Sequence, residues 1–178
     1  MKKKIIFFDG DGTLWYPSAT KRAQKPHWIY SDATTKENTL AHLELTPGTK
    51  QALERLQAKG LKLAVISANP HDEEVAIREI TGRTDHFGIT ELFDDIRASA
   101  GDDPQGKSAL MLSVLKRYGF TKDEALMIGD SYTYDYLAAK NVGIDAFFIE
   151  NTVSTLPEVP PSDLRTVREV IDLVDIIE

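Results

Sequence analysis

The sequence predicts an α/β fold: a three-layer, Rossmann-like parallel sheet with helices on both faces and a short cap-like insertion. Three observations support this prediction. Short and nearly continuous apolar runs recur along the chain, as in strands that are buried on both faces of a sheet. Segments with helical spacing of apolar residues alternate with these runs, which is typical of parallel sheets. One polar segment near the N-terminus interrupts the alternation.

Four apolar runs are the candidate strands, and a fifth run is weaker. Polar or turn-forming residues end each run, and the runs are long enough for strands of ordinary length. The four strong candidates are residues 5–8, 61–66, 125–128 and 146–149, and the weaker candidate is residues 95–98. We expect these runs to form one sheet that is covered on both faces.

Five segments between and after these runs have helical character, namely residues 49–59, 72–80, 108–118, 135–140 and a last segment that starts near residue 162. Gly60 and Gly119 follow two of them and are good C-terminal signals. Acidic residues open the second segment, where they suit the helix dipole. In the last segment helical spacing relates Leu164, Val167, Val170, Ile171 and Val174.

Length and composition limit the classes of protein to consider. The 178 residues predict one domain over 1–178, with a small cap-like insertion at about residues 17–46. The net charge of −7 argues against binding to nucleic acid or to anionic membranes. The absence of cysteine excludes disulfides, thiolate zinc sites and cysteine nucleophiles. Because no apolar stretch suits a signal peptide or a membrane span, we expect a cytoplasmic protein. The sequence leaves the oligomeric state open.

Polar side chains follow the candidate strands at the points where the strands end. In a doubly wound sheet, the loops at the carboxyl ends of the strands form the ligand crevice. We therefore expect these groups to lie close together in space. They are Asp9 and Asp11 after the first strand, Ser67, Ala68 and Asn69 at the second, Lys107 ahead of a helix, and Asp130, Ser131 and Asp135 after residues 125–128.

Several acids in one place repel one another, so a positive charge must offset them. Mg²⁺ prefers oxygen ligands, and Lys107 adds a second positive charge, so the site suits a phosphate dianion. Asp9 is the natural nucleophile because a carboxylate with an ordinary pKa is ionised at neutral pH. Asp11 lies where it can act as acid and base, and Gly10 and Gly12 allow tight turns close to phosphate.

Four of these segments resemble the motifs of one known family. The run Asp9-Gly10-Asp11-Gly12-Thr13-Leu14 resembles the first motif of the haloacid dehalogenase-like (HAD) superfamily. Ser67 and Lys107 resemble the second and third motifs, and residues 129–135 resemble the fourth. The order and spacing match over residues 5–150. Leu14-Trp15 and the short insertion are also similar to the small magnesium-dependent phosphatases with minimal caps.

The resemblance implies a Mg²⁺-dependent phosphomonoester phosphatase that works through an aspartyl phosphate. On this interpretation Asp9 is the nucleophile and a metal ligand, and Asp11 is the acid/base and offers its carbonyl to the metal. Asp130 is a further metal ligand. Ser131 and Asp135 support the metal ligands without binding the metal directly, and Asp135 orients a metal-bound water or Lys107. The phosphate would be held by Ser67 and the following backbone amides of Ala68 and Asn69, with help from Gly12 and Thr13, and Lys107 would neutralise both the phosphate and Asp9. The substrate would be a phosphorylated small molecule or a phosphopeptide.

Other interpretations stay open at this point. A phosphotransferase or phosphomutase of the same superfamily differs only in the access of water to the intermediate. A phospho-accepting signalling module uses similar groups, but its acceptor aspartate lies on a later strand. A non-catalytic binding protein on this scaffold is a third alternative. Taken singly, Ser67 is also explained as a turn residue or a helix cap, and Lys107 as a lysine that is exposed to solvent. Asp135 is also explained as the cap of the helix that it opens. The four histidines, His27, His42, His71 and His86, suit surface or cap positions.

Overall fold

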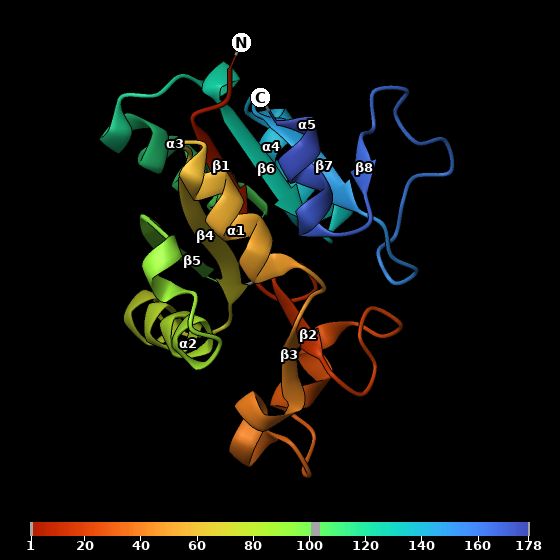
Figure 1. Ribbon diagram of the computed structural model, residues 1–178. Coiled ribbons are helices and arrows are strands. Elements are labelled where there is room, and N and C mark those ends of the chain that lie inside the picture. The colour runs from red at the N-terminus through yellow and green to blue at the C-terminus, as the bar shows by residue number, and fades with distance from the viewer. Residues whose placement is uncertain (1, 101–103, 178) are drawn as a thin grey trace.

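A six-stranded parallel sheet forms the centre of the molecule (Figure 1). The computed structural model describes residues 2–100 and 104–177. The strand order is β5-β4-β1-β6-β7-β8, and every neighbouring pair in it is parallel. The strands are β1 (Ile5–Phe8), β4 (Lys62–Asn69), β5 (Asp95–Ala100), β6 (Ala125–Gly129), β7 (Asp145–Ile149) and β8 (Thr166–Val167). The five strands expected from the sequence are all present, and β4 continues three residues beyond the expected end.

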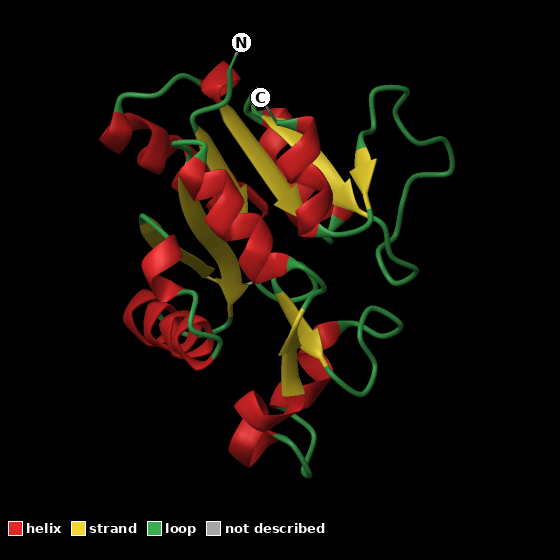
Figure 2. Cartoon of the chain, viewed as in Figure 1, coloured by secondary structure: helices red, strands yellow, loops and turns green. Residues whose placement is uncertain are grey.

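Helices cover both faces of the sheet, as Figure 2 shows. In β1, Ile6 and Phe8 belong to the apolar core on one face, and Ile5 and Phe7 belong to the core on the other face. All four side chains are fully buried, which explains why this strand is a continuous apolar run. The first core includes residues of α1 (Thr49–Ala58), α2 (Glu73–His86) and α5 (Leu173–Ile176), and the second includes residues of α3 (Pro104–Tyr118) and α4 (Ala138–Asn141).

Helices form near the segments that the sequence predicts, but some of them begin or end at other residues than expected. The Asp72 side chain caps α2 by accepting a hydrogen bond from the Val75 amide, and α2 continues to His86 rather than ending near residue 80. Helix α3 starts at Pro104 and so includes Lys107, which the sequence placed in the preceding loop. The segment expected as a helix over 135–140 is a π-helical turn, η5 (Tyr132–Leu137), followed by α4.

The insertion between the first two parallel strands forms a small unit of its own. Strands β2 (Trp15–Pro17) and β3 (Leu43–Leu45) pair antiparallel, and two 3₁₀ helices, η1 (Pro26–Tyr30) and η2 (Lys36–His42), lie between them in sequence. Figure 1 shows this unit beyond the arrowheads of β1, β4 and β6, at the carboxyl edge of the sheet. The insertion is therefore placed next to the loops that carry the predicted site.

The prediction that the last helix starts near residue 162 is wrong. Val167 lies in β8 and pairs with Ile149 of β7, so a buried strand position accounts for its apolar character. Helical structure begins only at the 3₁₀ helix η6 (Val170–Asp172), which has a capping box formed by Glu169 and Asp172, and continues into the short helix α5. The helical spacing of apolar residues in this segment thus arises from a strand followed by two short helices.

Within the described part of the chain, no helix is both long enough and apolar enough to span a membrane.

Candidate active site

A buried ion-pair network lies at the carboxyl end of β1. Asp9 directly follows β1, Lys107 lies in the first turn of α3, and Asp135 lies in the π-helical turn after β6. The Lys107 Nζ donates hydrogen bonds of 2.5 Å to Oδ1 of Asp9 and to Oδ1 of Asp135. The side chain of Lys107 is 3% exposed and that of Asp135 is fully buried, so water screens this network weakly. The structure therefore brings together three segments that are far apart in the sequence.

Asp130 completes an acidic cluster beside this lysine. One carboxylate oxygen from each of Asp9, Asp130 and Asp135 lies within 4.8 Å of the others. Burial raises the pKa of Asp9 to about 7 and raises that of Asp130 well above its usual value, and the neighbouring carboxylates add to both shifts. Burial opposes the charge on Lys107, but Asp135 and Asp9 outweigh it and raise the pKa of the lysine.

One lysine for three carboxylates leaves an excess of negative charge in a buried place. A hard divalent cation with oxygen ligands offsets such a charge, and Mg²⁺ accepts one or two carboxylates together with water and phosphate oxygens. Asp9 and Asp130 fit this ligand set. Asp135 is held by Lys107 and by the Ser131 amide, which donates a 2.9 Å hydrogen bond to its Oδ2. The donor set of the cluster thus fits a magnesium ion.

Asp11 is held by two donors on a single carboxylate oxygen. The Trp15 Nε1 donates a 3.0 Å hydrogen bond to Asp11 Oδ1, and the Tyr30 hydroxyl donates one of 2.6 Å to the same atom. Burial, and then the nearby Asp11, raises the pKa of Tyr30 well above its usual value, so this phenol keeps its proton and acts as the donor. The second oxygen of Asp11, Oδ2, makes no hydrogen bond to the described residues and is available for chemistry.

Two glycines allow the acidic segments to approach each other. Gly12 has a φ of +85°, and a Cβ at this position would overlap the carboxylate of Asp130. A Cβ on Gly129 would overlap the carboxylate of Asp135. The motif therefore needs glycine at both positions for steric reasons, and at Gly12 for conformational reasons as well.

The residues expected to hold phosphate lie around the same point. Ser67, Ala68 and Asn69 are the last three residues of β4, and a Cβ on Gly10 would lie 3.1 Å from the Ser67 Oγ. The Thr13 hydroxyl is buried and has no hydrogen-bond partner among the described residues, so it is an unused donor within the first motif. The side chain of Asn69 is engaged elsewhere, since Nδ2 donates to Glu79 and Oδ1 accepts from the His71 amide. The expectation for Asn69 concerns its backbone amide and stays a prediction.

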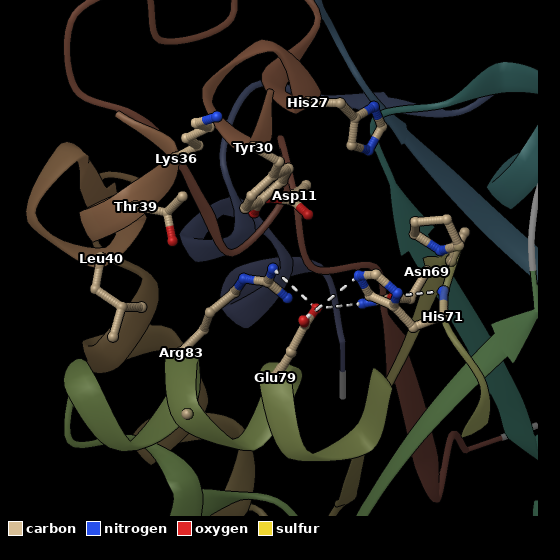
Figure 3. A pocket seen from close by; sticks show the side chains of 13 residues that line it. Asp11, His27, Tyr30, Lys36, Thr39, Leu40, Asn69, His71, Glu79 and Arg83 are labelled. Carbon is tan, nitrogen blue, oxygen red and sulfur yellow. Dashed lines mark hydrogen bonds and ion pairs between the residues drawn. The ribbon is translucent and has the colours of Figure 1, made fainter. Parts of the chain in front are cut away.

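A cavity of about 380 Å³ extends from Asp11 toward the insertion (Figure 3). One wall comes from η1 and η2 of the insertion, and the other comes from the end of β4, the loop after it and α2. His27 and His71, which were expected at surface or cap positions, are among the residues that line this cavity. The lining residues are Asp11, His27, Tyr30, Lys36, Thr39, Leu40, Ala68, Asn69, Pro70, His71, Glu79, Gly82 and Arg83.

Three residues that build the site belong to none of the motifs. Tyr30 and Arg83 occur in segments without a motif, and only the tertiary structure brings them to the cavity. Arg22, from the insertion, donates a 2.7 Å hydrogen bond from Nε to the Gly12 carbonyl and a bidentate pair to the carboxylate of Glu169. Arg22 thereby ties the first motif to the segment after β8. No local pattern marks an arginine for such a role.

Comparison with known proteins decides the family. A sequence model of the haloacid dehalogenase-like hydrolases matches residues 6–149. The chain is a haloacid dehalogenase-like hydrolase. The glyceraldehyde 3-phosphate phosphatase of Pyrococcus abyssi is 31% identical to this hydrolase over 123 residues, which are 67% of this chain and 48% of the relative. The acid sugar phosphatase of Staphylococcus aureus is 33% identical over 117 residues, which are 63% of this chain and 43% of the relative. The chain thus spans about half the length of these curated relatives.

Solved structures confirm the fold class of this haloacid dehalogenase-like hydrolase. An HAD phosphatase from Thermococcus onnurineus matches with a TM-score of 0.70 at 19% identity, over 99% of this chain and 97% of that chain. An uncharacterized protein from Listeria monocytogenes serotype 4b matches with a TM-score of 0.72 at 21% identity, over 97% and 96% of the two chains. The parallel α/β sheet expected from the sequence is therefore the fold of this family.

Proposed function

We propose that this hydrolase is a Mg²⁺-dependent phosphomonoester phosphatase that works through an aspartyl phosphate on Asp9. The observation that supports the proposal most is the convergence of Lys107 and the carboxylates of Asp9, Asp130 and Asp135 at the carboxyl end of the sheet. This site combines a nucleophile, a lysine and ligands for a cation, which are the groups that phosphoryl transfer requires.

In the first step, an oxygen of the Asp9 carboxylate attacks phosphorus. The hydrogen bond from Lys107 holds Asp9 Oδ1, and Oδ2 makes no hydrogen bond to the described residues, so Oδ2 is the attacking atom. The bond between phosphorus and the alcohol oxygen breaks, and Asp11 transfers a proton to that oxygen from its Oδ2. The donors Trp15 and Tyr30 on Asp11 Oδ1 fix the orientation of the carboxyl group for this transfer.

In the second step, water attacks the aspartyl phosphate and gives its proton to Asp11, which restores both carboxyl groups and releases phosphate. Mg²⁺, when held by Asp9 and Asp130, supplies positive charge that stabilises the charge developing on the phosphoryl oxygens. Lys107 stabilises the same charge from the protein side, and Thr13 and Ser67 offer hydroxyl donors to the phosphate.

The substrate is proposed to be a phosphorylated small molecule. The two curated relatives are named for glyceraldehyde 3-phosphate and for sugar phosphates, which are small molecules. The cavity beside Asp11 has about 380 Å³ and lies between the insertion and α2, a size that suits a small ligand. A phosphopeptide is the alternative substrate, and the two classes are separated by their relative rates of hydrolysis.

The test is release of inorganic phosphate from p-nitrophenyl phosphate and from a panel of phosphorylated metabolites and phosphopeptides. We expect hydrolysis with Mg²⁺, its loss with EDTA, and its loss in Asp9→Asn. Asp95→Asn is the matched control, because Asp95 is also a buried aspartate but lies away from the cluster, paired with Arg97 and Arg117. Hydrolysis by Asp9→Asn at the wild-type rate contradicts the proposal.

The same assay separates hydrolysis from transfer. With an added sugar or alcohol, a phosphatase releases inorganic phosphate in proportion to the substrate consumed. A phosphotransferase or phosphomutase instead gives a phosphorylated acceptor and little free phosphate. We expect inorganic phosphate to be the main product.

A further inference from the structure

Arg83 of α2 is a buried cation whose guanidinium has no hydrogen-bonded partner among the described residues. Its side chain lines the cavity beside Asp11 and is 9% exposed. The nearest carboxylate oxygen is Oε2 of Glu79, at 3.7 Å, and the guanidinium donates no hydrogen bond to any described residue. The guanidinium lies over the ring of Tyr30, 4.7 Å from the ring centroid. Because Arg83 lines the cavity, a group bound there is placed to accept hydrogen bonds from these unused donors.

Lys36 brings a second positive charge to the same cavity from the opposite wall. It belongs to η2 of the insertion, and among the described residues it has no ion-pair partner. Figure 3 shows Lys36 above the cavity and Arg83 below it, with Tyr30 and Asp11 between them and further back. The two cations therefore face one space that opens beside the predicted acid of the reaction.

The two carboxylates that line the cavity both accept hydrogen bonds from neighbouring side chains, and Asp11 does so only through Oδ1. Asp11 Oδ1 accepts hydrogen bonds from Trp15 and Tyr30. Glu79 accepts a 2.9 Å hydrogen bond from the Asn69 amide and lies 3.6 Å from the His71 ring nitrogen. Glu79 thus shares its charge among several neighbours and leaves the donors of Arg83 unsatisfied.

On the basis of this arrangement, and resting on the proposed function, we propose that the leaving group of the substrate carries an anionic group that binds between Arg83 and Lys36. The planar guanidinium of an arginine donates two parallel hydrogen bonds to a carboxylate or a phosphate. A neutral hydroxyl group accepts only a weaker hydrogen bond from it, without the attraction between opposite charges. Tyr30 separates Arg83 from Asp11 and contacts both, so a substrate with its ester oxygen at Asp11 places the far end of its leaving group near Arg83. Arg83 and Lys36 are then specificity-determining residues for the reaction at Asp9.

The experiment compares two pairs of substrates that differ in the second anionic group. The first pair is 3-phosphoglycerate and glycerol 3-phosphate, which differ by a carboxylate. The second pair is fructose 1,6-bisphosphate and fructose 6-phosphate, which differ by a phosphate. For wild-type protein we expect kcat/KM to favour the anionic member of at least one pair by about tenfold or more, as for a hydrogen-bonded charge. The pair that shows the preference identifies the anion as carboxylate or phosphate.

Substitution of Arg83 then tests the residue itself. We expect Arg83→Met to reduce this preference about tenfold, mainly through KM of the anionic substrate, and Arg83→Lys to retain part of it. Arg78→Met is the matched control, since Arg78 is an exposed arginine on the same helix that does not line the cavity. An equal loss for both members of a pair would mean that Arg83 acts only on the fold, and it would overturn the proposal.

Binding keeps this inference separate from the proposed function. Calorimetry with the Asp9→Asn protein measures the affinity for both members of each pair without turnover. Equal affinity of that protein for both members, in both pairs, would overturn the anion site even if wild-type protein is a phosphatase. A preference for the anionic member that is lost in the Asp9→Asn/Arg83→Met double variant would support the site even if wild-type protein hydrolyses none of them.

Discussion

The acidic cluster is expected to make the metal-free protein less stable at high pH, and Asp9→Asn is expected to relieve this cost. Burial raises the pKa of Asp9 from 3.8 to about 7 in the folded protein. Between these values the folded state binds more protons than the unfolded state, so the free energy of unfolding falls as the pH rises through this window. The full cost at about pH 8 is about 4 kcal/mol, since each pH unit corresponds to about 1.4 kcal/mol.

The hydrogen bond and the charge of Lys107 lower the pKa of Asp9, so their favourable contribution is already included in this cost. We therefore expect the metal-free variant, which has no charge at this position, to be about 4 kcal/mol more stable than wild type at about pH 8. We also expect the difference between the two proteins to grow by about 2–3 kcal/mol between pH 5 and pH 8. Urea denaturation with EDTA, followed by circular dichroism across this range, measures both quantities.

Magnesium should act in the opposite direction. An ion that binds the folded wild-type protein at about 100 times its Kd adds about 2.7 kcal/mol of stability, and the variant lacks one carboxylate ligand. Asp95→Asn is the control, and it should destabilise at all these pH values because it removes the partner of two arginines. A metal-free Asp9→Asn protein that is less stable than wild type, by an amount independent of pH, would refute this account of the cluster.

Three further substitutions test the geometry around this cluster. Gly12→Ala should abolish activity and reduce Mg²⁺ affinity, because the added Cβ would overlap the carboxylate of Asp130 and because Gly12 has a left-handed backbone conformation. Calorimetry measures the affinity, and normal metal binding would contradict this expectation. Tyr30→Phe should lower kcat about tenfold with little change in KM, because Asp11 loses one of its two donors, and an effect on KM alone would argue against this role. Arg22→Met should lower the free energy of unfolding by about 1–3 kcal/mol in urea, because the Gly12 carbonyl loses its donor, whereas a neutral change would show that this contact is dispensable.

The core of the fold was predictable because strands buried on both faces must be apolar throughout. Residues 5–8 and 125–128 show this plainly, and both are strands in the structure. Strand β8 was not predictable, because it has two residues and because Val167 also fits a helical spacing with Val170 and Val174. The pairing with β7, a contact distant in sequence, decides its structure.

The sequence contains a signal for the start of α3, and the expectation of a helix from residue 108 did not use it. Pro104 stands at the first position of this helix, where proline is favoured because the missing amide hydrogen is not needed. A helix that begins there carries Lys107 one turn inside its N-terminus. This places the lysine on a rigid element between Asp9 and Asp135, rather than on a loop.

The site was predictable only where its residues belong to motifs. Asp9, Asp130 and Lys107 follow strands or open a helix, so the sheet alone brings them together. Tyr30 and Arg83 lie in the insertion and in the middle of α2, and no spacing relates them to the motifs. Their positions depend on how the insertion packs against α2, which a single sequence does not encode in a local pattern.

Chemical trapping of the intermediate tests the central claim most directly. Wild-type protein is mixed with a ³²P-labelled substrate and Mg²⁺, quenched in acid within one turnover, and digested for peptide mapping by mass spectrometry. We predict an acid-stable label on the peptide that carries Asp9, absent from Asp9→Asn and lost on treatment with hydroxylamine. Full turnover of substrate with no label on Asp9, or with the label on another side chain, would contradict the account.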